Sequence, residues 1–460
     1  MWSFCEHRRS HIDECGERGS CCQGRAASRV RERSAPRTKG EPAQRSANPI
    51  GRNNVVSKIL GPAVALTTAA ALVLTGCAAD DGGTGGTGGE ASGGTYTVYA
   101  SLSLTGALAG SSKAQQESLE IAVDSINANG GIAGEQVELI IVDDQLDPTK
   151  AVTLLQEQID KEAPDLVIHG VSSAVTLAML PLLTRNEILS IGTTYANAIN
   201  DPATYPYAFG TNPVVALDPQ AAAELFADEG YTKIAYLGAN DALGQSIAEA
   251  FAAELPGKGF ELVQEAYAPT DLDMTAQLQR LQAGNPDALI IQGYGSASGY
   301  ALESRTKLGW DIPTYGDGGL GNGNNLALIS SEADWNNLYL RVFPINTAER
   351  KVTGTTAFEY LTSELEKRGS SFDQLMQLYT HLWDGLYVVK QAVEQAGSKD
   401  AAAVAEALEN LEPLSGESPY LTFPEFNSYT AENHFRNVGT DAYIVVRPGP
   451  VVKGTIESIE

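Results

Sequence analysis

Residues whose side chains could do chemistry are few in this chain, and their spacing argues against an enzyme. Residues 316–321 spell G-x-G-x-x-G, which at a dinucleotide site must follow a strand and open a helix. Residues 322–325, Asn-Gly-Asn-Asn, would break that helix instead. Asp143 and Asp144 are adjacent, so on a strand their carboxylates point to opposite faces. None of these features predicts a catalytic site.

The other reactive residue types lead to the same conclusion. The sequence holds no G-x-S-x-G, P-loop or H-E-x-x-H motif. No cysteine follows Cys77, and the three histidines beyond it, His169, His381 and His434, are isolated and fit surface or core positions. We therefore predict that the chain is not an enzyme and that it uses neither a cofactor nor a metal.

The charge of the chain is distributed unevenly. Residues 1–76 hold 12 of the 31 basic and 6 of the 57 acidic residues, which leaves 19 basic and 51 acidic residues downstream and a net charge of −32 there. A surface that acidic repels nucleic acid and anionic lipid headgroups. We therefore do not expect nucleic acid to be a partner.

Cys77 stands between an apolar stretch and a run of glycine, threonine and serine that cannot pack into a core. Lys58, the short apolar stretch after it and the small residues before the cysteine are features of a secretory signal peptide. Residues 74–77, Leu-Thr-Gly-Cys, resemble the lipobox of bacterial lipoproteins, in which the cysteine becomes the first mature residue and carries lipid. The resemblance implies that Cys77 anchors the chain to the outer face of the cytoplasmic membrane.

This interpretation divides the N-terminal region into three parts. Residues 55–76 are the expected lipoprotein signal peptide, and residues 77–94 are a lipid-anchored, glycine-rich tether. The alternative is a transmembrane helix of about 18 apolar residues, which Pro62 disfavours; either way the rest of the chain lies outside the cytoplasmic membrane. Residues 1–54 are basic and aperiodic, and we interpret them as a mis-called or disordered extension, with a genuine long n-region as the alternative.

Beyond the tether, strand and helix patterns alternate in two series. The first series comprises 95–104, 113–130, 136–144, 148–161, 165–170, 173–187 and 188–192. The second comprises 218–230, 233–241, 245–259, 260–267, 275–284, 287–295, 301–310 and 313–318. Strands that alternate with helices predict parallel sheets in doubly wound α/β domains, and two series predict two such lobes.

Helical patterns return between residues 355 and 411, and they are too many for the second lobe alone. We expect the chain to return to the first lobe, which gives a hinge of three crossings. Prolines that suit short connecting strands stand at 213, 344 and 413. The predicted lobe 1 is 95–212 with 346–412, and the predicted lobe 2 is 213–345 with 413–460. Lobes joined in this way close around a ligand by hinge bending.

Several of these segments resemble one family over about residues 95 to 410. The run from Lys113 to Ile159 resembles the first two β-α units of the type I periplasmic binding proteins, in particular the branched-chain amino acid (leucine/isoleucine/valine) receptors. Its recurrent parts include Gly130-Gly131-Ile132 and Asp143-Asp144, and later pieces such as Asn240-Asp241 and Gly293-Tyr294 follow in order. The resemblance implies a soluble capture protein of an ABC importer, which is a lipoprotein where no outer membrane exists.

The resemblance also assigns ligand-binding residues in lobe 1. Ser173 matches a serine after the third strand, at a helix start where a hydroxyl and N–H groups can hold a carboxylate; an N-cap role is the alternative. The next loop offers Thr193, Thr194 and Tyr195, of which Thr194 is our choice. Ser111 takes the place of an aromatic residue after the first loop.

In lobe 2 the resemblance is less regular. Tyr294 matches an aromatic residue that faces the ligand, and Leu243 replaces an expected aromatic before Gly244. The glutamate that holds the ligand's ammonium group in the family falls at Gly318, so Asp317 is our candidate for this role. Fewer aromatic residues predict a roomier or more polar pocket.

We therefore predict a monomeric, lipid-anchored substrate-binding protein that captures a branched-chain or other amino acid and delivers it to an ABC permease and its ATPase. Two alternatives stay open at this stage for the role: a sensor of the same fold that signals to a membrane partner, and a tethered scavenger or adhesion protein without a functional pocket. The ligand also stays open, because relatives of this fold carry amides, urea and aromatic acids.

Overall fold

Strands and helices alternate along the chain as the apolar periodicity predicts. The computed structural model describes residues 93–194, 196–321, 325, 337–348, 355–424 and 429–458. The predicted extension and signal peptide, the tether as far as residue 92, with Cys77, and Tyr195 lie outside the described residues.

The first sheet has the strand order β2-β1-β3-β4-β5, and all its neighbouring strands run parallel. Its strands are β1 (Thr95–Leu102), β2 (Gln136–Asp143), β3 (Leu166–His169), β4 (Leu189–Gly192) and β5 (Ala208–Gly210). The helices between them are α1 (Ala109–Ala128), α2 (Pro148–Lys161), α3 (Ser173–Arg185) and the 3₁₀ turn η1 (Asn197–Ile199). Three later helices also pack here: α10 (Thr356–Lys367), α11 (Met376–Ala396) and α12 (Ala401–Glu409).

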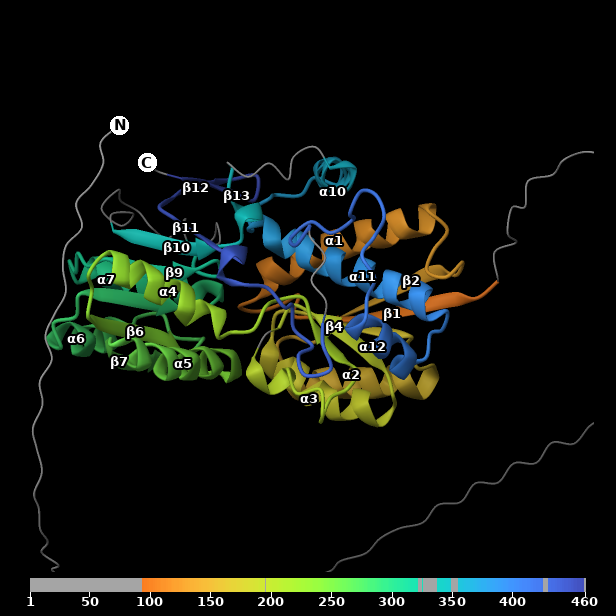
Figure 1. Ribbon diagram of the computed structural model, residues 1–460, viewed down its shortest axis with the longest axis horizontal. Helices are drawn as coiled ribbons and strands as arrows, with labels where there is room; N and C mark the ends of the chain where they lie inside the picture. Colours follow the sequence, from red (N-terminus) through yellow and green to blue (C-terminus); the bar gives the residue numbers. More distant parts are fainter. Residues whose placement is uncertain are drawn as a thin grey trace, which may run out of the picture. The chain divides into compact units, whose positions relative to one another are not determined.

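Both faces of the first sheet are buried, so its strands are apolar on both sides. Tyr96, Val98 and Ala100 of β1 belong to the core formed with α1, α11 and α12, whereas Tyr99 packs on the other face with α2 and α3. Figure 1 shows α1 and α11 on one side of this sheet and α2 and α3 on the other. The alternation of side chains along a strand explains this division.

The second sheet has the order β11-β10-β9-β8-β6-β7 and is parallel except for β11, which pairs antiparallel with β10. Its strands are β6 (Lys233–Ala239), β7 (Glu261–Tyr267), β8 (Ala288–Gln292), β9 (Thr314–Asp317), β10 (Leu338–Val342) and β11 (Ile444–Val446). The helical segments are α4 (Leu217–Asp228), α5 (Ala242–Glu254), η2 (Pro256–Lys258), α6 (Thr275–Ala283), α7 (Gly295–Lys307), η3 (Pro344–Asn346) and η4 (Thr440–Ala442). A small hairpin, β12 (Pro448–Val452) and β13 (Thr455–Ser458), follows β11.

Strand β6 shows the same alternation as β1. Ala235 and Leu237 belong to the core that contains α6 and α7, and Ile234 and Tyr236 belong to the core that contains α4 and α5. We refer below to the first sheet with its helices as lobe 1 and to the second sheet with α4–α7 as lobe 2. The prediction of two α/β lobes with parallel sheets is confirmed.

Three connections join the two lobes, two of them at prolines noted in the sequence. The first runs from β5 through Pro213 to α4, and the second runs from β10 through Pro344 to α10. The third lies after Arg436, which pairs with Pro213, and before β11. This differs from the expected crossing at Pro413, because residues up to Arg436 still contact lobe 1: Asp384 accepts N–H bonds from Leu421 and Thr422.

No helix among the described residues is both long enough and apolar enough to span a lipid bilayer.

The position of Gly192, at the end of β4, has no room for a side chain because of its neighbour in β3. It lies beside His169 of β3, and a Cβ at this position would come within 2.0 Å of the His169 carbonyl oxygen and 2.2 Å of its Nδ1. Only glycine therefore allows the buried imidazole to sit against the strand.

We predict that Gly192→Ala lowers the free energy of unfolding by about 1–3 kcal/mol, the usual range for an overpacked core. Urea unfolding followed by circular dichroism measures the change. Gly257→Ala is the matched control, because nothing lies within 4 Å of a Cβ there. An unchanged urea midpoint for Gly192→Ala would contradict this account of β4.

Candidate ligand-binding site

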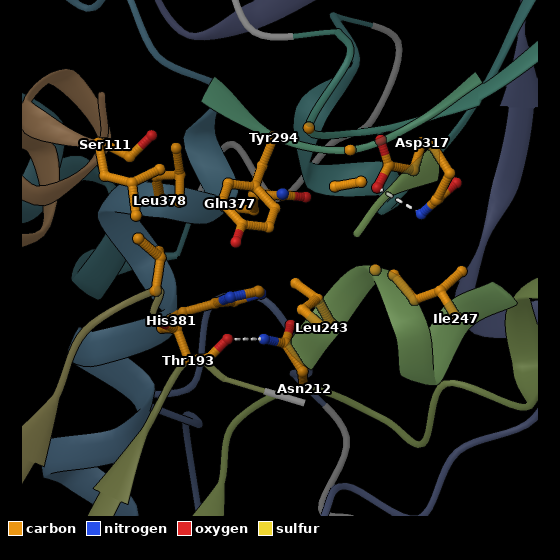
Figure 2. Close-up of a pocket in the computed structure, with 17 residues that line it drawn as sticks. Ser111, Thr193, Asn212, Leu243, Ile247, Tyr294, Asp317, Gln377, Leu378 and His381 are labelled. Atoms are coloured by element: carbon orange, nitrogen blue, oxygen red, sulfur yellow. Dashed lines mark hydrogen bonds between the residues drawn. The ribbon is translucent and has the colours of Figure 1, made fainter. Parts of the chain in front are cut away.

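A cavity of about 730 Å³, part of it open to solvent, lies where loops from both sheets meet. Figure 2 shows the side chains that surround it. Its lining consists of Leu108, Ser111, Val171, Thr193, Asn212, Ala239, Leu243, Gly244, Ile247, Gln292, Gly293, Tyr294, Asp317, Gly319, Gln377, Leu378 and His381. Most of these residues stand at or just after the carboxyl end of a parallel strand, where open α/β sheets bind ligands.

Asp317, the last residue of β9, is the only Asp, Glu, Lys or Arg among the described residues that line the cavity. Its Oδ1 accepts a bond from the Leu320 backbone N–H at 3.0 Å, and its Oδ2 accepts one from Gln292 Nε2 at 2.7 Å (Figure 2). Burial raises the pKa of Asp317, and the nearby Arg341 guanidinium opposes this rise. Because its Nε2 is engaged, Gln292 presents its Oε1 as an acceptor. This wall of lobe 2 therefore offers acceptors.

Arg341 organises the charges behind Asp317. It lies in β10 beside Asp317 in the parallel register, and it forms an ion pair of 2.8 Å with Asp218 of α4. Its guanidinium also lies 4.0 Å from the centre of the Tyr443 ring. Both partners of the ion pair are almost fully buried. Burial raises the pKa of Asp218 to about 6, although Arg341 acts in the opposite direction.

The lobe 1 wall offers donors. Thr193 Oγ1 accepts a bond of 2.8 Å from Gln115 Nε2, which leaves the hydroxyl proton of Thr193 free to donate into the cavity. Asn212 Nδ2 donates to the Thr193 carbonyl oxygen (Figure 2), which holds this loop in place. Val171, another lining residue, immediately precedes the N-terminus of α3, where Ser172 caps the helix through the Val175 N–H. Helix N-termini favour anionic groups.

Helix α11 of lobe 1 contributes a further wall through Gln377, Leu378 and His381. Gln377 is held by Asn346 of the second connection: its backbone N–H donates to Asn346 Oδ1 at 2.9 Å, and its Oε1 accepts from Asn346 Nδ2 at 2.6 Å. His381 is buried, and burial together with the Arg436 charge lowers its pKa to about 3. The imidazole is therefore neutral at physiological pH.

The structure brings five of the predicted site residues to the cavity: Ser111, Thr193, Leu243, Tyr294 and Asp317. Thr194, our choice in the loop after β4, is fully buried instead, with its Oγ1 3.3 Å from His169 Nδ1. Ser173 is buried at the start of α3, outside the cavity lining, and its neighbour Ser172 is the N-cap. Tyr195 and Cys77 lie outside the described residues.

Four polar lining residues were not identified from the sequence: Asn212, Gln292, Gln377 and His381. Gln377 and His381 are four residues apart, so they share one face of α11. Polar residues also stand elsewhere on this helix, so their spacing alone does not single out Gln377 and His381. Their place opposite the strand ends depends on the return of the chain to lobe 1.

The other polar features of the sequence serve the fold. Asp144 accepts bonds from the hydroxyls of Ser101 and Ser103, and Asp143 accepts the Leu104 N–H, so both acids support the loop after β1. Within the described part of the chain, no group of His, Cys, Asp or Glu side chains is arranged to hold a metal ion.

Two α/β lobes with a cavity at the carboxyl ends of their strands are typical of bilobed ligand-binding proteins. The sequence profile of the periplasmic binding protein family matches residues 95–446, and the chain belongs to this family. It is a type I periplasmic binding protein of the branched-chain amino acid group, as the sequence resemblance predicts. Membership of this family places the protein outside the cytoplasm.

Relatives with assigned names are binding proteins. Leu/Ile/Val-binding protein homolog 3 of Brucella melitensis is 25% identical over 336 residues, which cover 72% of this chain and 87% of that protein. The leucine-, isoleucine-, valine-, threonine- and alanine-binding protein of Pseudomonas aeruginosa is 24% identical, over 66% of this chain and 79% of its own length.

Solved structures show the same fold. The leucine-binding protein LivK of Thermotoga maritima matches with a TM-score of 0.64 and 20% identity, over 79% of this chain and 97% of its own. LivJ of Streptococcus pneumoniae, in complex with isoleucine, matches with a TM-score of 0.63 and 17% identity, over 80% and 99%. A fatty acid ABC transporter substrate-binding protein of Thermomonospora curvata matches at 0.66 and 16%, over 80% and 91%.

Because the pKa of Asp218 is raised in the folded protein, the free energy of unfolding should depend on pH. A carboxyl group whose pKa is about 6 in the folded protein and about 3.9 when unfolded binds its proton more tightly in the folded state. Its contribution to the free energy of unfolding is fully present below about pH 4 and is lost as the pH rises through about 6.

We therefore expect the free energy of unfolding of the wild type, relative to Asp218→Asn, to fall by about 2 kcal/mol between about pH 4 and pH 7. Urea unfolding at a series of pH values measures this difference. Asp228→Asn, at the exposed end of the same helix, is the control and should show no such change. A difference that does not vary with pH would show that Asp218 is ionised throughout.

Proposed function

We propose that the protein captures an α-amino acid between its two lobes and delivers it to the permease and ATPase of an ABC importer. The observation that carries this proposal is the division of hydrogen-bonding groups between the walls of the cavity. Lobe 1 presents the Thr193 hydroxyl as a donor, with the N-terminus of α3 directly after the lining residue Val171, and lobe 2 presents Asp317 and the Oε1 of Gln292 as acceptors. An amino acid zwitterion carries the complementary groups at its two ends.

The carboxylate of the ligand fits the lobe 1 wall. The first backbone N–H groups of a helix have no partner within the helix, and they attract anions. Val171, which precedes helix α3, lines the cavity together with Thr193, and Ser172 caps the helix through the Val175 N–H. A carboxylate there would accept charge-assisted bonds from the N–H groups and from the Thr193 hydroxyl.

The ammonium group fits the lobe 2 wall. No lysine or arginine is found among the described lining residues, so no cation of this lining competes with the ligand's ammonium group for Asp317. Ionised Asp317 is costly to bury alone, and a ligand cation beside it would restore its charge balance. Leu243, Ile247 and Leu378 provide apolar surface for the remainder of the ligand.

The relatives support the same role without fixing the ligand. Leucine, isoleucine and valine occur in the names of curated relatives, and the Streptococcus pneumoniae structure holds isoleucine. The ligand of this chain is accordingly proposed as a branched-chain or other amino acid.

Binding tests this proposal. We expect isothermal titration calorimetry with the 20 amino acids to detect at least one ligand, and both Thr193→Val and Asp317→Asn to weaken its binding by about tenfold to a hundredfold, the effect of one lost charge-assisted bond. Asp228→Asn is the control and should bind like the wild type. The far-ultraviolet circular dichroism spectrum checks that each variant folds. Absence of binding for all 20 amino acids would refute the proposed ligand class.

We further propose that lipid on Cys77 tethers the protein to the membrane. The Leu-Thr-Gly-Cys sequence and the glycine-rich segment after it support this proposal. In a bacterial host we expect the wild type in the membrane fraction with the mass of a lipidated N-terminal cysteine, and Cys77→Ser without lipid. An unlipidated wild type would contradict the proposal.

A further inference from the structure

The centre of the cavity contains polar groups that have no partner among the described residues. Figure 2 shows Gln377 and His381 extending from the same helix, α11, with the Tyr294 ring beside Gln377. Among the described residues, the His381 Nε2 is buried without a hydrogen-bond partner. The Gln377 Nε2 and the Tyr294 hydroxyl also make no hydrogen bond there, and these two side chains are half-buried. A buried polar group without a partner is costly, so a ligand that closes this space must satisfy these groups.

Gln377 is oriented as a donor. Asn346 engages both the backbone N–H and the side-chain Oε1 of Gln377, and Asn346 is itself fully buried. The carboxamide therefore turns its NH₂ group away from Asn346. A Cβ on Gly318 would lie 3.2 Å from this Nε2, so the amide reaches from α11 to the turn after β9 in lobe 2.

His381 is a fixed, neutral neighbour of this amide on the same face of α11. Its ring stacks on Phe423 at 6.4 Å between ring centres and meets Phe343 edge-on at 5.4 Å. A neutral imidazole can donate through one nitrogen and accept through the other, but it offers no charge to an ionised side chain.

The charged groups of the cavity also restrict which side chain the ligand can carry. An anionic side chain would find no cation among the described lining residues. A cationic side chain would compete with the ligand's own ammonium group for Asp317. An alkyl side chain would bury the Gln377 amide without an acceptor, and sites built to form a hydrogen bond discriminate strongly against analogues that lack it.

We propose that Gln377 and His381 read the side chain of the ligand, and that the preferred amino acids carry an uncharged hydrogen-bonding group, a hydroxyl or a carboxamide, in place of an alkyl group of the same shape. This inference rests on the proposed capture of an α-amino acid. It assigns Gln377 and His381 as specificity-determining residues and Asn346 as the residue that positions Gln377.

Matched ligand pairs test the inference on the full chain. Asparagine and leucine have nearly the same shape, as do threonine and valine. We expect calorimetry to show that the wild type binds the polar member of at least one pair about tenfold or more tightly than the apolar member. Gln377→Met keeps the length of the side chain and should abolish this ratio. Gln395→Met, on the exposed side of the same helix, should leave it unchanged.

A second variant tests whether loss of the Gln377 donor, rather than a loss of folding, removes the preference. Gln377→Glu keeps an oxygen for the bond from Asn346 Nδ2 and exchanges the NH₂ donor for a charged acceptor oxygen, so it should lose the preference; its unfolding midpoint checks that the fold is retained. A preference that survives in both Gln377 variants would overturn the assignment.

The outcomes also distinguish this inference from the proposed function. If leucine and valine bind as tightly as asparagine and threonine, the inference is overturned while the capture of amino acids stands. If no amino acid binds, the proposed function fails and the inference fails with it.

Discussion

The buried contacts of Arg341 hold the lobe 2 ends of all three connections together. Asp218, its ion-pair partner, follows the first connection; β10, which contains Arg341, leads into the second; and Tyr443, whose ring the guanidinium faces, follows the third. Removal of one partner from a buried ion pair leaves an uncompensated charge and is strongly destabilising. The relative placement of the three connections therefore depends on a single cation with partners from separate parts of the chain.

The same cation sets the electrostatics of the cavity. Arg341 lies between two acids, Asp218 on α4 and Asp317 on β9, so one positive charge serves two carboxylates. The carboxylate of Asp317 faces the cavity, while the opposite wall carries the hydroxyl donor of Thr193. Hinge closure in such an arrangement brings unlike groups toward the two ends of one small dipolar molecule, and this favours the closed form only when that molecule is present.

Local sequence patterns determine much of this fold and less of the site. Period-two apolar strands such as β1, with helices between them, were sufficient to predict two parallel sheets. The loop after β4 shows the limit of such reasoning. Gly192 leaves room for the His169 imidazole, Thr194 turns toward that ring, and Thr193 is left to face the cavity. Which of the two threonines faces the cavity therefore depends on contacts between strands. Gln377 and His381 were missed for a related reason, since only the return of the chain to lobe 1 brings α11 to the strand ends.

Asn346 belongs to the second connection and also holds Gln377 against the cavity. A torsional change in this connection therefore displaces a residue of the binding wall, and a ligand that engages the wall restrains the connection in turn. If Gln377 recognises the ligand as proposed, recognition and hinge motion both involve the contact between Asn346 and Gln377. In a lineage of such receptors, a substitution near Asn346 would alter which molecule is retained and how long it is retained, so the two properties would evolve together.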